Sequence, residues 1–365
     1  FGRGEGESSA DLWRAEVQEQ NKATRASSSW PLADSAHNCY QVAAAGWEGR
    51  LSQSAAILEN AGCCGALVPS ELAERVSPTT VIRCNEPLAK HTTLRVGGPA
   101  DIYVEPASEQ DLAAVLAYCH RHGWQLFVVG RGSNLLVRDH GFRGVVISLA
   151  QPQFSRIEVM GERLICGAGA KLKMVAVEAK HNSLAGLEFL EGIPGSLGGG
   201  LRMNAGAMGG ALFDVVESVR LMSFDGIAHE RTAQDMTVDY RSCPTLKDHI
   251  ALSAVLCGQA GSREEIEQRM NEYSRKRWQS QPAAPSAGCT FKNPASIPAG
   301  KLIDELGLKG SRIGGALVST EHGNFIVNDG TATARDVLAL MEVIRQRVRA
   351  ERGIELETEV EIIGE

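Results

Sequence analysis

The sequence has little of what membrane proteins and nucleic-acid binders need. Its formal net charge is −7 at pH 7, which argues against a general binder of nucleic acid or of membrane surfaces, although a local basic pocket is compatible with it. No apolar run reaches the ~18 residues that span a bilayer, and nothing at the start of the printed sequence is typical of a secretory signal. We therefore expect a cytoplasmic protein that binds neither nucleic acid nor membrane.

The cysteines form no metal or disulfide pattern. There are nine of them in 365 residues, an odd number. None lies in a CxxC pair or a Cys/His cluster, so we expect reduced thiols, no structural zinc and no other metal site. A composition of 43% hydrophobic and 22% charged residues is ordinary for a soluble globular protein, and the length predicts two or more domains.

The character of the chain changes near residue 85. Residues 1–84 are partly polar, glycine-rich or low in complexity, and we expect an atypical extension there, partly disordered and without a catalytic role. Two short helices, at 10–20 and 52–61, fit its sequence. From residue 85 onward, strand-like and helix-like patterns alternate.

These patterns predict an α+β fold. Ser108 caps a helix that ends at Gly123, a charged helix spans 263–279, and a capping box from Thr333 to Asp336 precedes an amphipathic helix. There is no regular βαβ repetition. The expected strands lie at 101–105, 125–129, 144–148, 164–167, 215–222, 250–257 and 359–363.

Residues 286–294 combine a small-residue turn with three reactive or polar side chains. The turn at Ala287-Gly288 lets the backbone approach a ligand closely, because glycine has no Cβ. Cys289 can hold a transferable proton, and Lys292 and Asn293 can grip an anionic or polar ligand. Taken alone, the segment is equally compatible with a tight loop around a buried cysteine.

Two further segments are rich in glycine. Residues 129–137 follow an apolar strand and expose successive N–H groups, which suits a pyrophosphate, although the third glycine and the helix of the dinucleotide fingerprint are missing. A plain glycine hairpin is the alternative. Residues 192–210 hold eight glycines in nineteen positions, which predicts neither a good helix nor a packed strand. We expect a flat ligand against this backbone rather than a linker.

Two charged positions near the end of the pattern are weaker signals. Arg241, after Tyr240, could bind a carboxylate or phosphate with paired donors, although an isolated arginine is more often a solvated surface group. Strand alternation places Glu357, Glu359 and Glu361 on one face, and such a pattern is more often a solvated face than a site.

Taken in order, these segments resemble a known family. Six segments carry the resemblance: HTTLRVGGPAD at His91–Asp101, the loop at 130–134, the run from Gly186 to Gly195 with Asn204-Ala-Gly206, Tyr240-Arg241, the Cys289 loop and the strand of Glu359. In this order they resemble the UDP-N-acetylenolpyruvoylglucosamine reductases. The resemblance covers roughly residues 86–364. The spacing of 47 positions between Arg241 and Cys289 resembles that of the shorter, type II branch of the family.

The resemblance implies a fold and a set of ligands. It implies a two-part FAD-binding domain of the vanillyl-alcohol-oxidase (PCMH) type at 85–258, followed by a smaller α+β substrate-binding domain at 259–365. It also implies non-covalent FAD, NADPH as reductant, an enolpyruvyl UDP-sugar as substrate, and a monomer or weak oligomer.

The family's catalytic positions map onto three residues of this chain. Arg241 and Glu359 match the residues that face the substrate carboxylate, where negative charge develops. Cys289 matches the proton donor, a position that is usually serine. A thiol with a pKa near ~8.5 is mostly protonated at neutral pH and is a better acid than an alkyl hydroxyl.

The resemblance also implies binding residues. For the cofactor these are Thr92, Thr93, Gly97, Gly98, Gly130, Arg131, Gly132, Ser133, Asn134, Gly192, Ile193, Gly195, Ser196, Gly199, Asn204 and Gly206. For substrate or NADPH they are Tyr240, Arg277, Lys292, Asn293, His322 and Asn324. A structural histidine is an equal alternative for His322. Two other functions compete with this one: that of another FAD-dependent oxidase or dehydrogenase, and that of a non-catalytic nucleotide-binding homologue.

Overall fold

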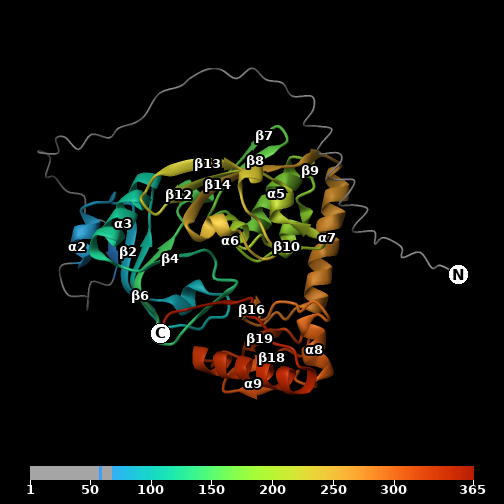
Figure 1. The fold of residues 1–365 in the computed structure, drawn as a ribbon. Helices are drawn as coiled ribbons and strands as arrows, with labels where there is room; N and C mark the ends of the chain where they lie inside the picture. Colours follow the sequence, from blue (N-terminus) through green and yellow to red (C-terminus); the bar gives the residue numbers. More distant parts are fainter. Residues whose placement is uncertain (1–56, 60–67) are drawn as a thin grey trace, which may run out of the picture. The chain divides into compact units, whose positions relative to one another are not determined.

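The computed structural model describes residues 57–59 and 68–365 (Figure 1). The helix expected at 10–20 lies outside the described residues. The helix expected at 52–61 is wrong where it can be checked, because β1 (Ile57–Glu59) is a strand that pairs in parallel with β2 (Val81–Pro87). Since α2 (Val68–Ala73) and β2 both begin before residue 85, regular structure begins before the change in composition.

A five-stranded sheet forms the first part, in the order β1-β2-β3-β6-β4. Its further strands are β3 (Pro99–Glu105), β6 (Phe142–Ser148) and β4 (Leu126–Val129). Between β3 and β4 runs α3 (Glu109–His122), in which Ser108 accepts from the Asp111 amide at 3.1 Å and Gly123 closes the helix in the left-handed conformation. Both predicted ends of this helix are confirmed.

A second five-stranded sheet follows, in the order β13-β12-β14-β8-β7. Its strands are β13 (Ala228–Thr232), β12 (Val216–Ser223), β14 (His249–Cys257), β8 (Arg163–Gly167) and β7 (Ile157–Met160). Helical segments around it are α4 (Pro152–Ser155), α5 (Leu172–His181), α7 (Arg263–Ser280), η2 (Glu188–Gly192), η3 (Leu212–Asp214), η4 (Ala233–Asp235) and η5 (Pro244–Lys247). This part also has two two-stranded sheets. In one, β10 (Gly206–Ala207) pairs with β11 (Gly210–Ala211), and in the other, β9 (Leu184–Ala185) pairs with β15 (Gln259–Ala260).

One hydrophobic core serves both five-stranded sheets. It joins side chains of the first sheet, such as Ile102 and Val145, to those of the second, such as Leu164 and Val219, and it includes the inner face of α3. The strand patterns in the sequence predicted these strands correctly. Every strand predicted between residues 101 and 257 is present and begins within two residues of its expected start.

The glycine-rich segment 192–210 contains a helix, so the expectation that it could not be one is wrong. Helix α6 (Leu197–Arg202) includes three consecutive glycines. A Cβ at Gly198 would lie 3.1 Å from the Ala168 side chain, and one at Gly200 would lie 3.1 Å from Leu172 and Leu212. Close packing against these neighbours therefore outweighs the poor helix propensity of glycine.

The C-terminal part has its own sheet and core. The sheet order is β16-β19-β18-β17, with β16 (Ser286–Cys289), β19 (Phe325–Asn328), β18 (Ala316–Val318) and β17 (Arg312–Ile313). Helices α8 (Ala299–Glu305) and α9 (Ala334–Arg352) accompany it, and α9 packs on β17 and β18. The predicted apolar face of α9, Val337, Leu340, Met341, Ile344 and Val348, is buried.

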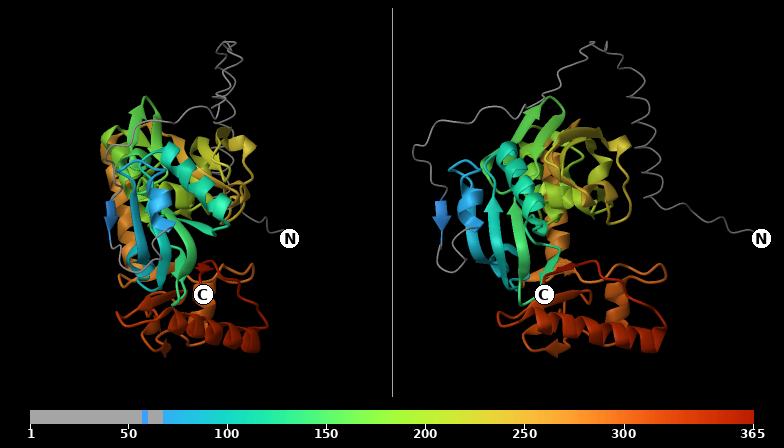
Figure 2. Two further views of the ribbon diagram at one scale, coloured as in Figure 1. Left: turned by 90° about the vertical axis from the view of Figure 1, so that its left-hand side faces the viewer. Right: turned by 60° about the vertical axis from the view of Figure 1, so that its left-hand side comes forward.

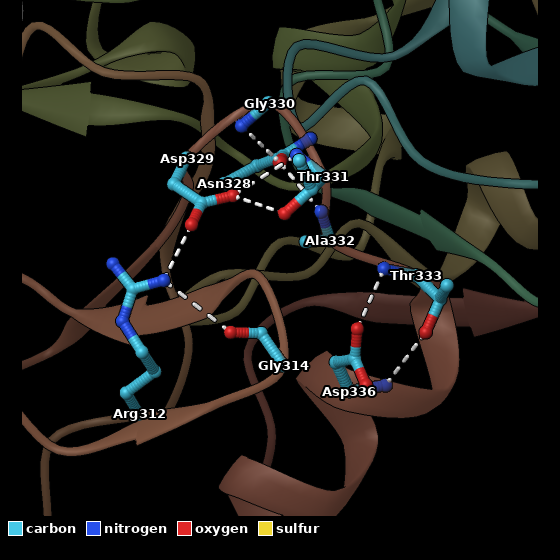
Figure 3. Close-up of polar contacts among 9 residues, drawn as sticks. All are labelled: Arg312, Gly314, Asn328, Asp329, Gly330, Thr331, Ala332, Thr333 and Asp336. Atoms are coloured by element: carbon cyan, nitrogen blue, oxygen red, sulfur yellow. Dashed lines mark hydrogen bonds and ion pairs between the residues drawn. The ribbon is translucent and has the colours of Figure 1, made fainter.

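The turn before α9 is held by short-range polar contacts (Figure 3). Asn328 Oδ1 accepts from the amides of Gly330 and Ala332, at 2.7 and 3.0 Å. Arg312 pairs with Asp329 across this turn. The predicted capping box of Thr333 and Asp336 is confirmed, with bonds of 3.1 and 3.0 Å.

Long-range contacts join the C-terminal part to the first sheet's loops. The last strand, β20 (Glu361–Ile363), runs back and pairs in parallel with β5 (Leu135–Val137). Both views of Figure 2 show the C-terminus beside the blue-green part of the chain. Asp139 accepts from the first two amides of α9, at 2.8 and 2.9 Å. In the described part of the chain, no helix combines the length and the apolarity needed to cross a membrane.

Candidate active site

The loop around Cys289 lies at the edge of the C-terminal sheet. Strand β16 pairs antiparallel with β19, in the register Cys289 to Phe325, and an irregularity follows Ser286. Gly288 has φ +76°, a left-handed conformation that glycine adopts at no steric cost. The predicted small-residue turn therefore exists, and it presents Cys289 as a partly buried side chain.

Arg241 and Glu359, far apart in sequence, form an ion pair. Arg241 Nε lies 3.1 Å from Glu359 Oε1, and Nη1 donates to the Gly206 carbonyl at 3.4 Å. The arginine itself has φ +56°, an unusual conformation for a non-glycine residue that often marks functional sites. Its guanidinium lies 5.3 Å from the centre of the exposed Tyr240 ring.

The surroundings of Glu359 and Cys289 raise the pKa of both side chains. Burial raises the pKa of Glu359, while Arg241 and Lys292 oppose that rise. Burial, and after it the Glu359 charge, raise the pKa of the Cys289 thiol to about 11, against weaker opposing effects of Arg241 and Asn324. The three predicted catalytic residues thus act on one another electrostatically, and Cys289 keeps its proton at neutral pH.

A cavity of about 1300 Å³ lies next to the Cys289 loop, and Cys289, Arg241 and Glu359 themselves are not among the residues that line it. Gly288 and Phe325, which flank Cys289 along the chain and across the sheet, line it. The cavity is basic. Nine of its lining side chains are basic and one, Glu105, is acidic; the basic ones are Lys90, His91, Arg95, Arg131, Lys171, Arg202, Lys247, His249 and Arg277.

Seven of the sixteen predicted cofactor residues line this cavity: Thr92, Thr93, Gly130, Arg131, Ser133, Ser196 and Gly199. The two glycine-rich segments meet there. Ser133 Oγ donates to the Pro194 carbonyl at 2.6 Å, and a Cβ on Gly130 would lie 2.5 Å from Ser196 Oγ. A larger residue at position 130 would close the space between the two loops.

The other nine predicted cofactor residues are not among the cavity-lining residues. Some serve packing: a Cβ on Gly98 would lie 2.2 Å from the Asp139 carbonyl, and one on Gly132 would lie 2.2 Å from the His91 carbonyl. Others hold backbone, as Asn204 does by accepting from the Phe213 amide at 3.2 Å. The complete set is Gly97, Gly98, Gly132, Asn134, Gly192, Ile193, Gly195, Asn204 and Gly206.

The predicted substrate residues divide in the same way. Arg277 lines the cavity, and its guanidinium lies 5.5 Å from the ring centre of Trp278. Lys292 pairs with Glu357 at 3.0 Å. Tyr240 lies beside Arg241, as described above.

Three more of them hold the fold around Cys289. Asn293 accepts from the Ala299 amide at the start of α8, at 3.0 Å. Asn324, buried, bonds the amide and carbonyl of Phe291 at 2.9 and 2.7 Å. His322 accepts from the Asn324 amide at 3.2 Å, and burial lowers its pKa, which is the environment of a neutral structural histidine.

Sequence reasoning missed several cavity residues, above all Lys171 and Arg202. Lys171 precedes α5, and Arg202 ends α6, where it donates to the Leu246 carbonyl at 2.8 Å and pairs with Glu361 at 3.1 Å. Both are isolated cations in the sequence. The one available signal was that Arg202 lies inside the glycine-rich segment.

Comparison with known proteins identifies the family. Residues 281–363 match the C-terminal domain of UDP-N-acetylenolpyruvoylglucosamine reductase, and residues 100–231 match an FAD binding domain. UDP-N-acetylenolpyruvoylglucosamine reductases from Geotalea uraniireducens and Syntrophomonas wolfei are 46% and 40% identical, over 78% and 79% of this chain and 94% and 97% of theirs. The chain belongs to the UDP-N-acetylenolpyruvoylglucosamine reductase family.

The solved structure of a family member agrees with this membership. The crystal structure of UDP-N-acetylenolpyruvylglucosamine reductase from Thermus caldophilus matches with a TM-score of 0.68 and 38% identity, over 78% of this chain and 99% of that one. The family resemblance and the α+β fold class, an FAD-binding domain followed by the reductase C-terminal domain, are thereby confirmed.

The cavity fits the FAD that this family uses. Its predominantly basic lining suits a pyrophosphate, and the close approach at Gly130 leaves backbone rather than side chain facing the space. Its volume of about 1300 Å³ exceeds the ~300–1,000 Å³ of ordinary ligand pockets. There is room for a second ligand beside the cofactor.

Proposed function

We propose that this protein catalyses the NADPH-dependent, FAD-mediated reduction of UDP-N-acetylglucosamine enolpyruvate to UDP-N-acetylmuramate, in the synthesis of peptidoglycan precursors. The observation that carries the proposal is the Arg241–Glu359 pair, which acts electrostatically on a protonated Cys289. The neighbours of Cys289, Gly288 and Phe325, line the basic cavity. Membership of the reductase family supports it.

In the proposed reaction, Arg241 and Glu359 receive the substrate carboxylate. FAD, when bound, supplies the hydride that it takes from NADPH. Negative charge then develops on the carboxylate as an enolate, and the guanidinium of Arg241 stabilises it with fixed positive charge and directed donors. Glu359 can bond to the same carboxylate only after it takes up a proton, and burial, which raises its pKa, makes that uptake less unfavourable.

Cys289 completes the proposed reaction by protonating the carbon next to the carboxylate. The S–H bond of Cys289 breaks, a C–H bond forms, and the enolate returns to a carboxylate. The resulting thiolate regains a proton from water, because a pKa of about 11 makes the thiol the stable form at neutral pH.

We also propose a division of labour along the chain. Residues 85–258 would bind FAD, and 259–365 would supply the substrate-binding part with Cys289 and Glu359. A second core, most of whose side chains come from the C-terminal part, supports this division, although Leu94, Val96 and Leu136 also belong to it. The odd number of cysteines supports a cytoplasmic location.

Anaerobic half-reactions test the function. The purified protein should be yellow, NADPH should bleach it, and UDP-N-acetylglucosamine enolpyruvate should restore the colour without oxygen. A colourless protein that takes up no flavin on reconstitution would defeat the proposal. A yellow protein reoxidised only by oxygen would instead be an oxidase, and one that neither NADPH nor substrate affects would be a non-catalytic homologue.

A further inference from the structure

Asn134 links the glycine loop at 130–134 to Glu359, which lies two residues before β20. Its side-chain Nδ2 donates to the Glu359 carbonyl at 3.1 Å, and its own carbonyl accepts from the Glu361 amide at 3.0 Å. The two bonds lie on either side of Val360. They extend the parallel pairing of β20 with β5 by one residue toward Glu359.

The opposite side of Glu359 is held by the Cys289 loop. The Glu359 amide donates to the carbonyl of Thr290 at 2.9 Å, and Phe291 and Thr358 form an isolated antiparallel bridge. The backbone of Glu359 is therefore fixed from two directions. One support comes from the residue after Cys289, and the other comes from Asn134.

Asn134 is not among the residues that line the cavity. Gly130, Arg131 and Ser133 line the cavity, whereas Asn134 does not. The expected role of Asn134 as a direct cofactor contact therefore has less support than that of its three neighbours. Its carboxamide is committed to the Glu359 carbonyl, 225 positions away.

We propose that Asn134 is a positioning residue, which holds Glu359, and with it Arg241, in register with Cys289. This inference rests on the proposed function, and it assigns Asn134 to the substrate side of the reaction. A displacement of about 1 Å in a catalytic group can lower a rate by as much as ~100-fold. Losing the one side-chain bond to this backbone should therefore affect the step that uses Glu359.

The two half-reactions separate this role from cofactor binding. In Asn134→Ala, reduction of bound FAD by NADPH should stay within about twofold of wild type, because that step does not use the carboxylate-binding pair. Reoxidation by UDP-N-acetylglucosamine enolpyruvate should slow by about 10- to 100-fold. Asn134→Asp keeps the shape but cannot donate, so it should show the same split. Asn182→Ala, which removes a similar bond to the Glu178 carbonyl on α5, is the matched control and should change neither step.

A second readout needs neither substrate nor turnover. Glu359 contributes to the raised pKa of Cys289, so moving Glu359 should make Cys289 easier to ionise. Iodoacetamide should then alkylate Cys289 at least about threefold faster at pH 8.5 in Asn134→Ala than in wild type. If the wild-type protein is not reoxidised by the sugar nucleotide, the proposed function fails. The alkylation rate then still tests whether Asn134 holds Glu359 in place.

Three results would overturn the inference. One is a parallel loss of both half-reactions together with weaker FAD binding, which would make Asn134 a cofactor contact. Another is an Asn134→Asp variant that behaves as wild type in reoxidation, which would show that only the shape matters. The third is an unchanged alkylation rate of Cys289 in both variants.

Discussion

The protonation state of Cys289 is open to a direct chemical test. At pH 8 an ordinary thiol with a pKa near ~8.5 is roughly one-quarter thiolate. A thiol with a pKa of about 11 is only ~0.1% thiolate at that pH, which is a difference of roughly 200-fold. Since the more basic thiolate is also about tenfold more nucleophilic, the net expectation is alkylation that is ~20-fold slower.

The assay compares the same cysteine in the folded and the unfolded chain. Iodoacetamide is added at a series of pH values, and the peptide that contains Cys289 is quantified by mass spectrometry. The chain in concentrated urea supplies the reactivity of an ordinary thiol. Partial burial of Cys289 slows the folded reaction further, so the ratio at pH 8 should be at least ~20.

The pH profile decides the matter independently of access. For a pKa of about 11, the folded rate should climb about tenfold per pH unit beyond pH 9, where the urea reference has already levelled off. A folded profile that levels near pH 9 would refute the reasoning, because burial and the Glu359 charge would then not raise the pKa of Cys289 above that of an ordinary thiol. If the profile holds, Cys289→Ala should slow reoxidation by the substrate ~10²- to 10⁴-fold, and Cys289→Ser should restore most of it.

Three further predictions concern the charges and the thiols. Arg241→Lys keeps a charge but loses the planar donors, so reoxidation of reduced flavin by the substrate should slow by about 100-fold in stopped-flow measurements. Asp139→Ala frees two amides at the start of α9, and urea unfolding should show a loss of about 1–3 kcal/mol. Burial raises the pKa of Cys166 to about 12 and that of Cys119 to about 11. Because the folded chain keeps thiol protons that the unfolded chain releases, the free energy of unfolding should fall as pH rises above ~8.5, and urea midpoints at pH 7 to 10 measure this.

Local signals in the sequence predicted local structure well. The capping box at Thr333 and the buried stripe of α9 are both present, because a helix is specified by residues within a few positions of one another. Helix α6 shows the limit of such reasoning. Its three glycines oppose a helix, and only the neighbours brought close by the fold, Ala168, Leu172 and Leu212, explain why one forms.

The long-range contacts of the site had no signal of their own. Thr93 Oγ1 donates to the Ser286 carbonyl at 2.7 Å, across 193 positions, and Asn134 reaches Glu359 across 225. Both residues belong to motifs whose side chains were predicted to bind the cofactor. A motif indicates which residues lie near a ligand, whereas the role of each side chain depends on the distant segment that packs against it.

The charge distribution explains how an acidic chain can bind anionic ligands. The formal net charge of −7 repels a polyanion at long range, but screening limits that field to about 8–10 Å at ordinary ionic strength. Within the cavity the basic side chains outnumber the single acid, Glu105. The acidic side chain that does approach the proposed substrate, Glu359, is paired with Arg241, and burial raises its pKa. Two different parts of the structure therefore handle the charges of the proposed ligands. The basic lining of the cavity attracts phosphates. The Arg241–Glu359 pair, which the Cys289 loop and Asn134 hold in place, accommodates the carboxylate of the substrate beside that of Glu359.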